Sequence, residues 1–367
     1  MKNKKESLYT KVYNDILSKI KTGYYRVGEK LPTELELTQI YGVSRITIAR
    51  ALKDLSNINL IYRIKKSGTF VNGKIDNRTQ LIIPVILPFP QDYNELFKGI
   101  QSVSLLYNTF IPFYNTKNNV TKERNTLEEL LKINPDGLIV YPCAARDNLD
   151  LYSELLSKKI PLICLDRDIY GLTTPLVTST NFENMEQIIS QLAKKGHERI
   201  GFFSVSDRMA ITEEARFKGY CSGLIKNNIK VKKEYIFDNT DMHQKEINLT
   251  PRQQRNLFNK YVAKCIEEYE QFKEKPTAIC CVNDRSMHAF FDAATKKGYR
   301  IPEDFILTGF DCIDEDRDFI AFNNIITVKQ NFFEMGASAM RLILKILNGQ
   351  SYLMKEQIPG TLLTNEL

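Results

Sequence analysis

Residues 31–55, LPTELELTQIYGVSRITIARALKDL, carry the signals for two short helices joined by a tight turn. Thr33 can cap the first helix, and Glu36, three residues later, completes a capping box. Gly42 lies where the chain must reverse, a position that favours a residue free to adopt positive φ. Ser44 can then cap the second helix. The stretch therefore predicts a helical hairpin.

The two sides of this hairpin differ in chemistry. Apolar residues at helical spacing predict the buried sides: Leu35, Leu37 and Ile40 on the first helix, and Ile48, Ala51, Leu52 and Leu55 on the second. The exposed N-terminal end of the second helix keeps Arg45, Ile46, Thr47 and Ala49. A helix-turn-helix presents this end to the major groove of DNA. An ordinary helical hairpin is the alternative interpretation.

The N-terminal part of the chain is strongly basic. Residues 1–80 contain 16 Lys and Arg against 7 Asp and Glu, a net charge of +9, whereas the remaining residues carry a net −2. A basic segment joined to a near-neutral body is typical of a nucleic-acid-binding module with a second function attached. At 367 residues, 43% of them hydrophobic, the chain is long enough for two or three domains.

The segments on either side of the hairpin extend the pattern. Residues 8–22 have apolar residues at helical spacing, which predicts an amphipathic helix. After Leu55, short apolar runs at 60–63 and 69–71 enclose the turn KKSG, which predicts a β-hairpin with lysines at its tip. Three helices followed by a basic hairpin is the plan of a winged helix-turn-helix.

Residues 9–71 resemble the N-terminal domain of GntR-family transcriptional regulators. The matching motifs are the glycines and LPTE of residues 23–34, YGVSRIT at 41–47, RALKDL at 50–55 and SGTFV at 67–71. The resemblance implies a set of residues that contact bases or phosphates: Thr33, Ser44, Arg45, Thr47, Arg50, Lys65, Lys66 and Gly68. Leu35 and Ala49 stand where the family often has arginine, so sequence readout is expected to be thinner or differently placed here.

The rest of the chain alternates short apolar runs with amphipathic helical patterns. Residues 73–80 are polar and without apolar periodicity, which predicts a linker between a domain at 1–72 and a second one at 81–367. The expected strands are 81–87, 110–114, 137–141, 160–165, 199–205, 277–282 and 305–310. The expected helices are about 92–107, 122–133, 148–158, 181–195, 212–228, 251–273, 284–297 and 331–347. This alternation predicts two doubly wound parallel sheets, with a ligand at the carboxyl ends of the strands.

Residues 81–350 resemble the effector domain of the LacI family, a periplasmic-binding-protein type I fold. The matching motifs include DGLIVYP at 136–142, KKGHERIGFF at 194–203, VNDRSMHA at 282–289 and KGYRIPEDFILTGFD at 297–311. A GntR-type N-terminal domain on such a body resembles arabinose-repressor-like regulators. The implied fold is α/β, with an N-terminal winged helix-turn-helix and a two-lobed, doubly wound effector domain.

Polar residues stand beside several predicted strand ends or helix starts: Asp166, Arg216, Asn283, Asp311 and Gln330. Carboxylate, guanidinium and amide groups can each exchange two hydrogen bonds with neighbouring hydroxyls, as a polyol ligand requires. The LacI resemblance assigns the same positions to effector contacts. The alternative for a single Asp or Asn at a strand end is a helix N-cap, above all at Asn283.

A sugar ring also needs an aromatic face, and the chain contains no Trp. The candidates are Phe89, Tyr93 and Phe237, of which Phe89 in the loop PFPQDY is favoured, with core packing as its alternative. Asp92 in the same loop and Arg167 complete the expected effector-site residues.

Catalysis, a cofactor and a metal site find no support. The three histidines are scattered, and motifs of serine hydrolases, zinc proteases and P-loop proteins are absent. Seven cysteines without a C-x-x-C pair predict neither a disulfide framework nor a zinc site. The polar N-terminal sequence MKNKKESLYTKVYND and the lack of a long apolar run predict no signal peptide and no membrane span, hence a cytoplasmic location.

The expected function is regulation of transcription, as a repressor of carbohydrate use. The expected partners are a pseudo-palindromic double-stranded DNA operator, a monosaccharide bound between the two lobes, and a second copy of the chain in a homodimer. The main alternative is a purine or nucleoside effector for the same class of regulator. A solute-binding protein without a DNA role is disfavoured by the basic N-terminal segment and the expected lack of a signal peptide. An enzyme with an aminotransferase-like body is disfavoured because the LacI-type motifs occupy that part of the chain.

Overall fold

The computed structural model describes residues 8–21, 24–26, 28–57, 60–64, 67–72, 80–88, 94–105, 107–143, 146–204, 210–237, 251–313 and 317–364. Its contacts divide the chain into two units, residues 1–81 with 104–109, and residues 82–103 with 110–367. We call residues 8–72 the head and the second unit the body. The expected linker at 73–80 lies outside the described residues, except for Gln80.

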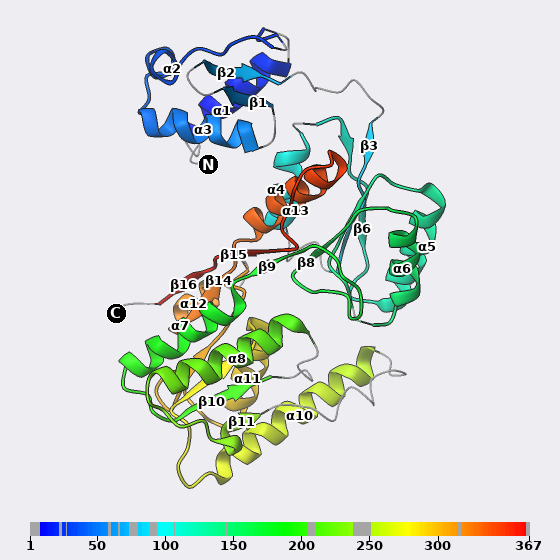
Figure 1. The fold of residues 1–367 in the computed structure, drawn as a ribbon. Helices are drawn as coiled ribbons and strands as arrows, with labels where there is room; N and C mark the ends of the chain where they lie inside the picture. Colours follow the sequence, from blue (N-terminus) through cyan, green and yellow to red (C-terminus); the bar gives the residue numbers. More distant parts are fainter. Residues whose placement is uncertain are drawn as a thin grey trace. The chain divides into compact units, whose positions relative to one another are not determined.

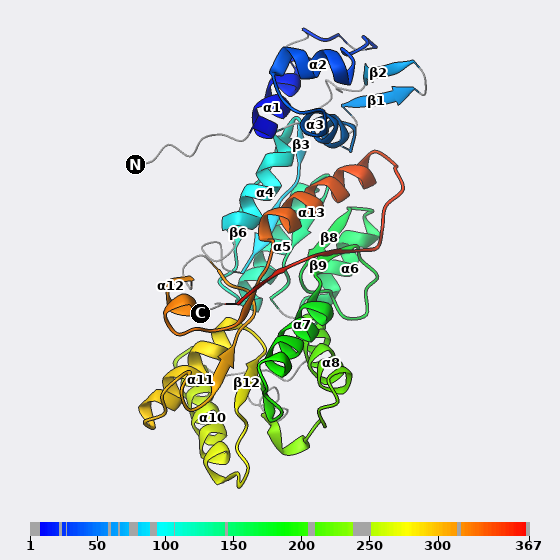
Figure 2. The same cartoon turned by 90° about the vertical axis from the view of Figure 1, so that its left-hand side faces the viewer.

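The head consists of three helices and a β-hairpin (Figure 2). Its elements are α1 (Leu8–Lys21), α2 (Glu34–Tyr41), α3 (Arg45–Asn57), β1 (Ile61–Ile64) and β2 (Gly68–Val71). The two strands are antiparallel, with Ile61 opposite Val71 and Ile64 opposite Gly68. One apolar cluster unites α1, α3 and the hairpin, and Val12, Ile16, Ile48 and Leu55 are fully buried in it. The predicted winged helix-turn-helix is therefore confirmed.

The capping signals of the helical hairpin act as predicted. The Thr33 side chain accepts a hydrogen bond from the Glu36 backbone N–H at 3.3 Å, and a Glu36 carboxylate oxygen accepts one from the Thr33 N–H at 2.7 Å. Gly42 ends α2 with a φ of 62°, the left-handed conformation that glycine adopts without strain. Ser44 Oγ accepts a hydrogen bond from the Thr47 N–H at 3.3 Å, so Ser44 caps α3.

The predicted buried side of α2 is wrong for two of its three residues. Leu37 is 1% exposed, but Leu35 is 67% and Ile40 58% exposed. Leu35 lies two residues, about 200°, around the helix from Leu37, so the two side chains cannot share a face. Ile40 lies about 60° from Leu37, but α2 has only eight residues and contacts the core over a narrow strip. Helix α2 therefore exposes two large apolar side chains.

The first lobe of the body is built on a six-stranded sheet in the order β15-β9-β8-β7-β4-β6, with all neighbours parallel (Figure 1). Its strands are β4 (Val85–Leu87), β6 (Phe113–Asn115), β7 (Leu138–Val140), β8 (Leu162–Leu165), β9 (Leu176–Ser179) and β15 (Lys355–Ile358). Its helices are α4 (Asn94–Ser104), α5 (Val120–Ile133), α6 (Leu149–Ser157) and α13 (Phe332–Leu347). The short strands β3 (Leu81–Ile82) and β5 (Thr109–Phe110) pair with each other in a separate two-stranded sheet.

The second lobe contains a four-stranded parallel sheet in the order β11-β10-β12-β13. Its strands are β10 (Ile200–Phe203), β11 (Ile236–Phe237), β12 (Ala278–Cys281) and β13 (Ile306–Thr308). Its helices are α7 (Asn181–Lys194), α8 (Ile211–Lys226), η1 (Lys233–Tyr235), α10 (Pro251–Gln271), α11 (Asp284–Lys296) and α12 (Arg317–Phe322). The predicted pair of doubly wound parallel sheets is confirmed.

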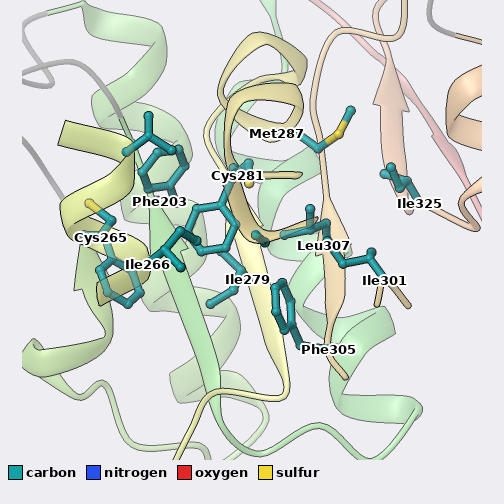
Figure 3. Close-up of a cluster of buried hydrophobic side chains, with 14 of the residues drawn as sticks. Phe203, Cys265, Ile266, Ile279, Cys281, Met287, Ile301, Phe305, Leu307 and Ile325 are labelled. Carbon is teal, nitrogen blue, oxygen red and sulfur yellow. The ribbon is translucent and has the colours of Figure 1, made fainter. Parts of the chain in front are cut away.

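The central strands are buried on both faces because helices cover both sides of each sheet. Figure 3 shows one such core, in which Phe203, Ile279 and Leu307 from neighbouring strands of the second lobe meet Ile266 of α10 and Phe305, which directly precedes β13. Cys280 and Cys281 of β12 are fully buried, as expected for cysteines that act as small apolar residues. In the described part of the chain, no helix is both long and apolar enough to cross a membrane.

The chain passes between the two lobes more than once. The chain leaves the first lobe after β9, returns before α13, and leaves again after β15. The antiparallel pair of β14 (Thr327–Lys329) and β16 (Thr361–Leu363) therefore lies at the junction of the lobes. The apolar runs of the sequence do not predict β9, β11 or β14 to β16. These strands are short, and β15 has the polar sequence KEQI with alternating exposure, as a sheet edge permits.

Candidate functional site

The first turn of α3 presents the exposed guanidinium of Arg45, which forms an ion pair with Glu34 of α2. Arg45 is 78% exposed, and its Nε lies 3.2 Å from a carboxylate oxygen of Glu34 in α2. The other carboxylate oxygen of Glu34 pairs with Arg63 of β1. Hydrogen bonding from Arg63, and then from Arg45, lowers the pKa of the Glu34 carboxyl below its ordinary value. Glu34 therefore links the start of α3 to the hairpin and orients both arginines.

The remaining predicted DNA-contact residues lie around this point. Thr33 and Ser44 cap α2 and α3, and the hydroxyls of Ser44 and Thr47 are 2.8 Å apart. The Arg50 guanidinium lies 4.7 Å from the centre of the Tyr9 ring. Gly68 begins β2 with a φ of 137°. The predicted lysines at the tip of the hairpin, Lys65 and Lys66, lie outside the described residues.

The body contains a cleft of about 400 Å³ between its two lobes. All six predicted effector residues that the structure describes line this cleft: Asp166, Arg167, Arg216, Asn283, Asp311 and Gln330. The other three, Phe89, Asp92 and Tyr93, lie outside the described residues. Phe237, the remaining aromatic candidate, is 3% exposed in the core of the second lobe and does not line the cleft. The expectation is wrong for Phe237 because β11 places it inside the sheet.

Arg216 is the most firmly held of these side chains. It lies on α8, is 3% exposed, and its guanidinium lies 3.8 Å from the centre of the Phe310 ring. Its Nε donates to Asn181 Oδ1 at 2.8 Å and its Nη1 to the Val282 carbonyl at 2.9 Å. Nη2 lies 3.2 Å from Asp311 Oδ1. The cleft therefore holds a fixed guanidinium at its base.

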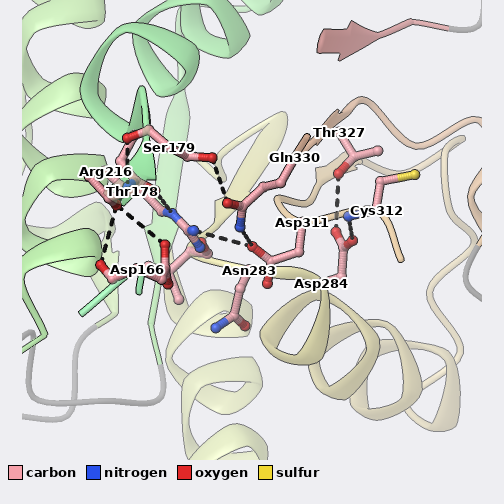
Figure 4. A network of polar contacts seen from close by, with 12 residues as sticks. Asp166, Thr178, Ser179, Arg216, Asn283, Asp284, Asp311, Cys312, Thr327 and Gln330 are labelled. Atoms are coloured by element: carbon pink, nitrogen blue, oxygen red, sulfur yellow. Dashed lines mark hydrogen bonds and ion pairs between the residues drawn. The ribbon is translucent and has the colours of Figure 1, made fainter. Parts of the chain in front are cut away.

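A chain of hydrogen bonds links Arg216 to the first lobe (Figure 4). Gln330, which follows β14, donates through Nε2 to Asp311 Oδ1 at 2.6 Å and accepts from Ser179 Oγ at 2.6 Å. Ser179 ends β9 of the first lobe, whereas Asp311 follows β13 of the second. The polar network thus runs across the junction of the lobes, where a ligand would meet both.

Asp166 supplies a second carboxylate, from the end of β8. The Tyr141 hydroxyl donates to its Oδ2 at 2.9 Å, and Thr178 Oγ1 lies 3.3 Å from its Oδ1. Its φ is 58°, a left-handed conformation that aspartate adopts more readily than most residues. The strand end and this turn together place Asp166 at the edge of the sheet, in the cleft.

Asp311 is the electrostatically perturbed group of the cleft. Removal from water raises the pKa of its carboxyl from 3.8 to about 6, the Arg216 cation opposes this rise, and the Asp166 carboxylate adds to it. Its φ of 119° is rare for a residue with a side chain. The carboxyl therefore titrates in a range where biological pH changes matter.

Asn283 is a helix cap, as the alternative interpretation predicts, and it also lines the cleft. Asn283 Oδ1 accepts a hydrogen bond from the Ser286 N–H at 2.8 Å and caps α11, and the same residue also lines the cleft. The next residue, Asp284, is buried and accepts hydrogen bonds from the Cys312 N–H at 2.5 Å and Thr327 Oγ1 at 3.1 Å. Asp284 thereby fixes the backbone beside Asp311.

The residues that hold the predicted ones in place were not foreseen: Tyr141, Thr178, Ser179, Asn181 and Asp284. Tyr141 is the last residue of the predicted strand at 137–141, whereas Asp166 directly follows the one at 160–165, so strand-end position is a usable signal for Tyr141 too. Ser179 and Asn181 adjoin β9, which the apolar pattern did not reveal. The cleft as a whole offers fixed carboxylates, amides and a guanidinium, an arrangement suited to hydrogen bonding with a ligand rich in hydroxyl groups.

Two protein families match separate parts of the chain. Residues 8–71 match the bacterial regulatory proteins of the gntR family. Residues 189–364 match the periplasmic binding protein-like domain. The first match covers the helices and hairpin of the head, and the second covers most of the second lobe and the junction.

Longer stretches of the chain are similar to known transcription regulators. The arabinose metabolism transcriptional repressor of Geobacillus stearothermophilus is 25% identical over 365 residues, which is 96% of this chain and 94% of that protein. The HTH-type transcriptional repressor PurR of Mannheimia succiniciproducens is 28% identical over 233 residues, 62% of this chain and 63% of that protein. A LacI family transcriptional regulator from Enterococcus faecium, solved with bound ribose, has a TM-score of 0.60 at 20% identity and covers 77% of this chain and 97% of its own.

Proposed function

We propose that this chain, a transcriptional regulator that joins a GntR-type DNA-binding domain to a LacI-type periplasmic-binding-protein-like domain, represses genes of carbohydrate use under the control of a small sugar. Residues 1–72 bind DNA, 73–80 form the linker, and 81–367 bind the effector and a second copy of the chain. The protein acts in the cytoplasm by binding alone, without catalysis.

The convergence of the effector residues carries this proposal. Asp166 comes from the first lobe, Arg216, Asn283 and Asp311 from the second, and Gln330 from the junction, yet all line one cleft. A ligand that bonds to both lobes stabilises the arrangement in which the lobes are close together. This differential affinity is what allows a small molecule to shift the equilibrium between two conformations of a regulator.

The chemistry of the cleft favours a neutral polyol as the effector. Asp166 and Asp311 can accept hydrogen bonds from hydroxyl groups, and Arg216 has partners for three of its five N–H donors among the described residues. The Arg216 charge is already opposed by Asp311, and an anionic ligand would also meet the carboxylate of Asp166. The named relatives include a repressor of arabinose metabolism.

A thermal-shift screen of the full chain tests this function. A ligand that binds only the folded protein raises the melting temperature in a concentration-dependent way. The panel contains neutral pentoses and hexoses, their phosphates, and purine bases and nucleosides, and calorimetry follows any hit. We expect a neutral monosaccharide to bind. Binding of a purine or nucleoside instead would support the alternative effector, which the similarity to a PurR protein also allows.

Asp311→Ala and Arg216→Ala provide the matched variants for calorimetry. Each should fold and bind DNA, yet lose affinity for the sugar, because each variant lacks a charged group that would hydrogen-bond to the ligand in the cleft. Wild-type affinity in both variants would place the effector site elsewhere. Exposed Lys218→Ala, two residues after Arg216 on α8, should leave affinity unchanged.

A further inference from the structure

An apolar side chain lies at the tip of the proposed reading helix. Ile46, in the first turn of α3, is 82% exposed and follows Arg45, which is 78% exposed. Single exposed apolar residues are ordinary on protein surfaces. Ile46, however, occupies the turn that a helix-turn-helix inserts into the major groove. The free-energy cost of exposing the Ile46 side chain to water can therefore be recovered when this turn binds DNA.

Helical spacing directs Ile46 away from the core. The buried side of α3 is formed by Ile48, Ala51, Leu52 and Leu55. Ile46 precedes Ile48 by two residues, which is about 200° around the helix. Arg50 and Lys53, four and seven residues after Ile46, share its side and are exposed. The outward side of α3 thus presents one apolar side chain followed by two cations.

The polar groups of the same turn have partners within the head. The hydroxyls of Ser44 and Thr47 lie 2.8 Å apart, and Arg45 is held by Glu34 at 3.2 Å. Leu35, which follows Glu34, is 67% exposed. Leu35 directly follows Glu34 in the sequence, and Ile46 directly follows Arg45. Each therefore adds exposed apolar surface next to a member of this ion pair.

We propose that Ile46 recognises thymine by packing against its C5-methyl group in the major groove. Thymine is the base that presents a methyl group there, and apolar contact is the means by which proteins read it. The inference rests on the proposed DNA-binding function and makes it more specific. The basic charge of residues 1–80 attracts any DNA sequence, so selectivity has to come from base contacts such as this one.

Deoxyuridine substitution tests the methyl contact directly. The full-length protein first selects binding duplexes from a random double-stranded DNA library. The recovered duplex is then synthesised with deoxyuridine in place of each thymidine in turn, which removes only the methyl group. We expect one position in each half-site at which uracil weakens wild-type binding about fourfold, the value of one buried methyl. Ile46→Ala should bind the thymine and uracil duplexes alike at that position.

Ile40→Ala is the matched control. It removes the same atoms from a 58% exposed position on α2, outside the first turn of α3, and should keep the wild-type ratio between thymine and uracil duplexes. Circular dichroism establishes that each variant folds. Equal wild-type binding to all thymine and uracil duplexes would overturn the methyl contact while leaving DNA binding intact, and discrimination retained by Ile46→Ala would overturn its assignment to this residue. Failure to recover any duplex would contradict the DNA-binding function itself.

Discussion

At the scale of single residues, the same device occurs in the head and in the body: an arginine positioned by a carboxylate. In the head, Glu34 holds Arg45, which stays 78% exposed and available to DNA. In the body, Asp311 meets Arg216, which is 3% exposed. Solvent screening makes the exposed pair weak, whereas the buried pair depends on every partner being present. The first pair therefore sets orientation, and the second sets the charge balance of the cleft.

Substitution of Arg45 should lower both the affinity for DNA and the discrimination between DNA sequences. If Arg45 donates two hydrogen bonds to a guanine, Arg45→Ala should cost about 1–3 kcal/mol on the selected duplex and less on unrelated DNA. Fluorescence anisotropy with both duplexes measures the ratio. Arg26→Ala removes the same charge from an exposed position outside the helical hairpin and should leave the ratio unchanged. A wild-type ratio in Arg45→Ala would remove this residue from base recognition.

Asp311 should make the stability of the protein depend on pH in a predictable direction. Its pKa is raised from 3.8 to about 6 by folding, so its carboxyl contributes stability below pH 4 that is lost as the pH rises through 6. The side chain of the Asp311→Asn variant cannot ionise, so this variant lacks the pH-dependent contribution to stability. The difference in free energy of unfolding between wild type and Asp311→Asn should therefore fall between pH 4 and pH 7, as urea titrations at several pH values can measure. A constant difference would contradict the raised pKa.

The same carboxyl predicts the pH dependence of effector binding, with the opposite sign. The ionised form is the better hydrogen-bond acceptor for hydroxyl groups, and it is lost below pH 6. Sugar affinity should then fall about tenfold between pH 7 and pH 5 if only the ionised form binds. Calorimetry at the two pH values measures this change, and the residual affinity of Asp311→Asn should vary little between them.

At the scale of elements, close packing of α7 and α8 positions Arg216. Gly219 and Gly223 lie one turn apart on α8, and both face α7. A Cβ atom at Gly219 would lie 2.3 Å from the Phe182 carbonyl oxygen, and one at Gly223 would lie 2.7 Å from Ile189 Cβ. The missing side chains let α8 approach so closely that Arg216 Nε reaches Asn181, the first residue of α7, at 2.8 Å.

Gly219→Ala should therefore affect both stability and effector binding. Its Cβ meets backbone rather than a flexible side chain, so we expect a loss of about 1–3 kcal/mol in the free energy of unfolding. The displacement of α8 should also separate Arg216 from Asn181 and weaken sugar binding in the molecules that remain folded. Denaturant titration and calorimetry measure the two effects. Unchanged stability would show that the helices can separate without cost.

Sequence patterns predicted the elements that are apolar and regular, and failed where structure depends on distant partners. Thr33, Gly42 and Ser44 signal helix ends through local chemistry, and the structure bears them out. β9 and β15 have mixed sequences, and their strand conformation depends on pairing with each other and, for β9, also with β8. Asp166 and Arg216 were identifiable from strand ends and family motifs. Tyr141 has only its position at a strand end as a sequence signal, and the hydrogen bonds by which Tyr141 and Asn181 orient Asp166 and Arg216 depend on tertiary contacts.

At the scale of the whole molecule, DNA recognition requires more surface than one head provides. A single α3 offers one arginine and one isoleucine at its exposed first turn. Helix-turn-helix proteins solve this by binding as dimers to two half-sites about one helical turn apart. We therefore expect a homodimer on a pseudo-palindromic operator, with the body supplying a self-complementary interface. Mass photometry with and without the selected duplex measures the stoichiometry. A monomer on DNA at micromolar concentration would contradict this assembly.

The sugar should act on this dimer through the junction of the lobes. Changing the operator from almost fully bound to almost fully free requires about 10⁴-fold differential affinity for the two conformations, or about 5.5 kcal/mol. Hydrogen bonds to charged groups contribute about 1.5–3 kcal/mol each, so contacts to Asp166, Arg216 and Asp311 suffice if they form together in one conformation only. Anisotropy titrations of the selected duplex should show release on adding the sugar to wild type. Asp311→Ala should bind the duplex as tightly as wild type and remain bound at every sugar concentration. Sugar-dependent release by this variant would show that the signal bypasses the network from Ser179 to Arg216.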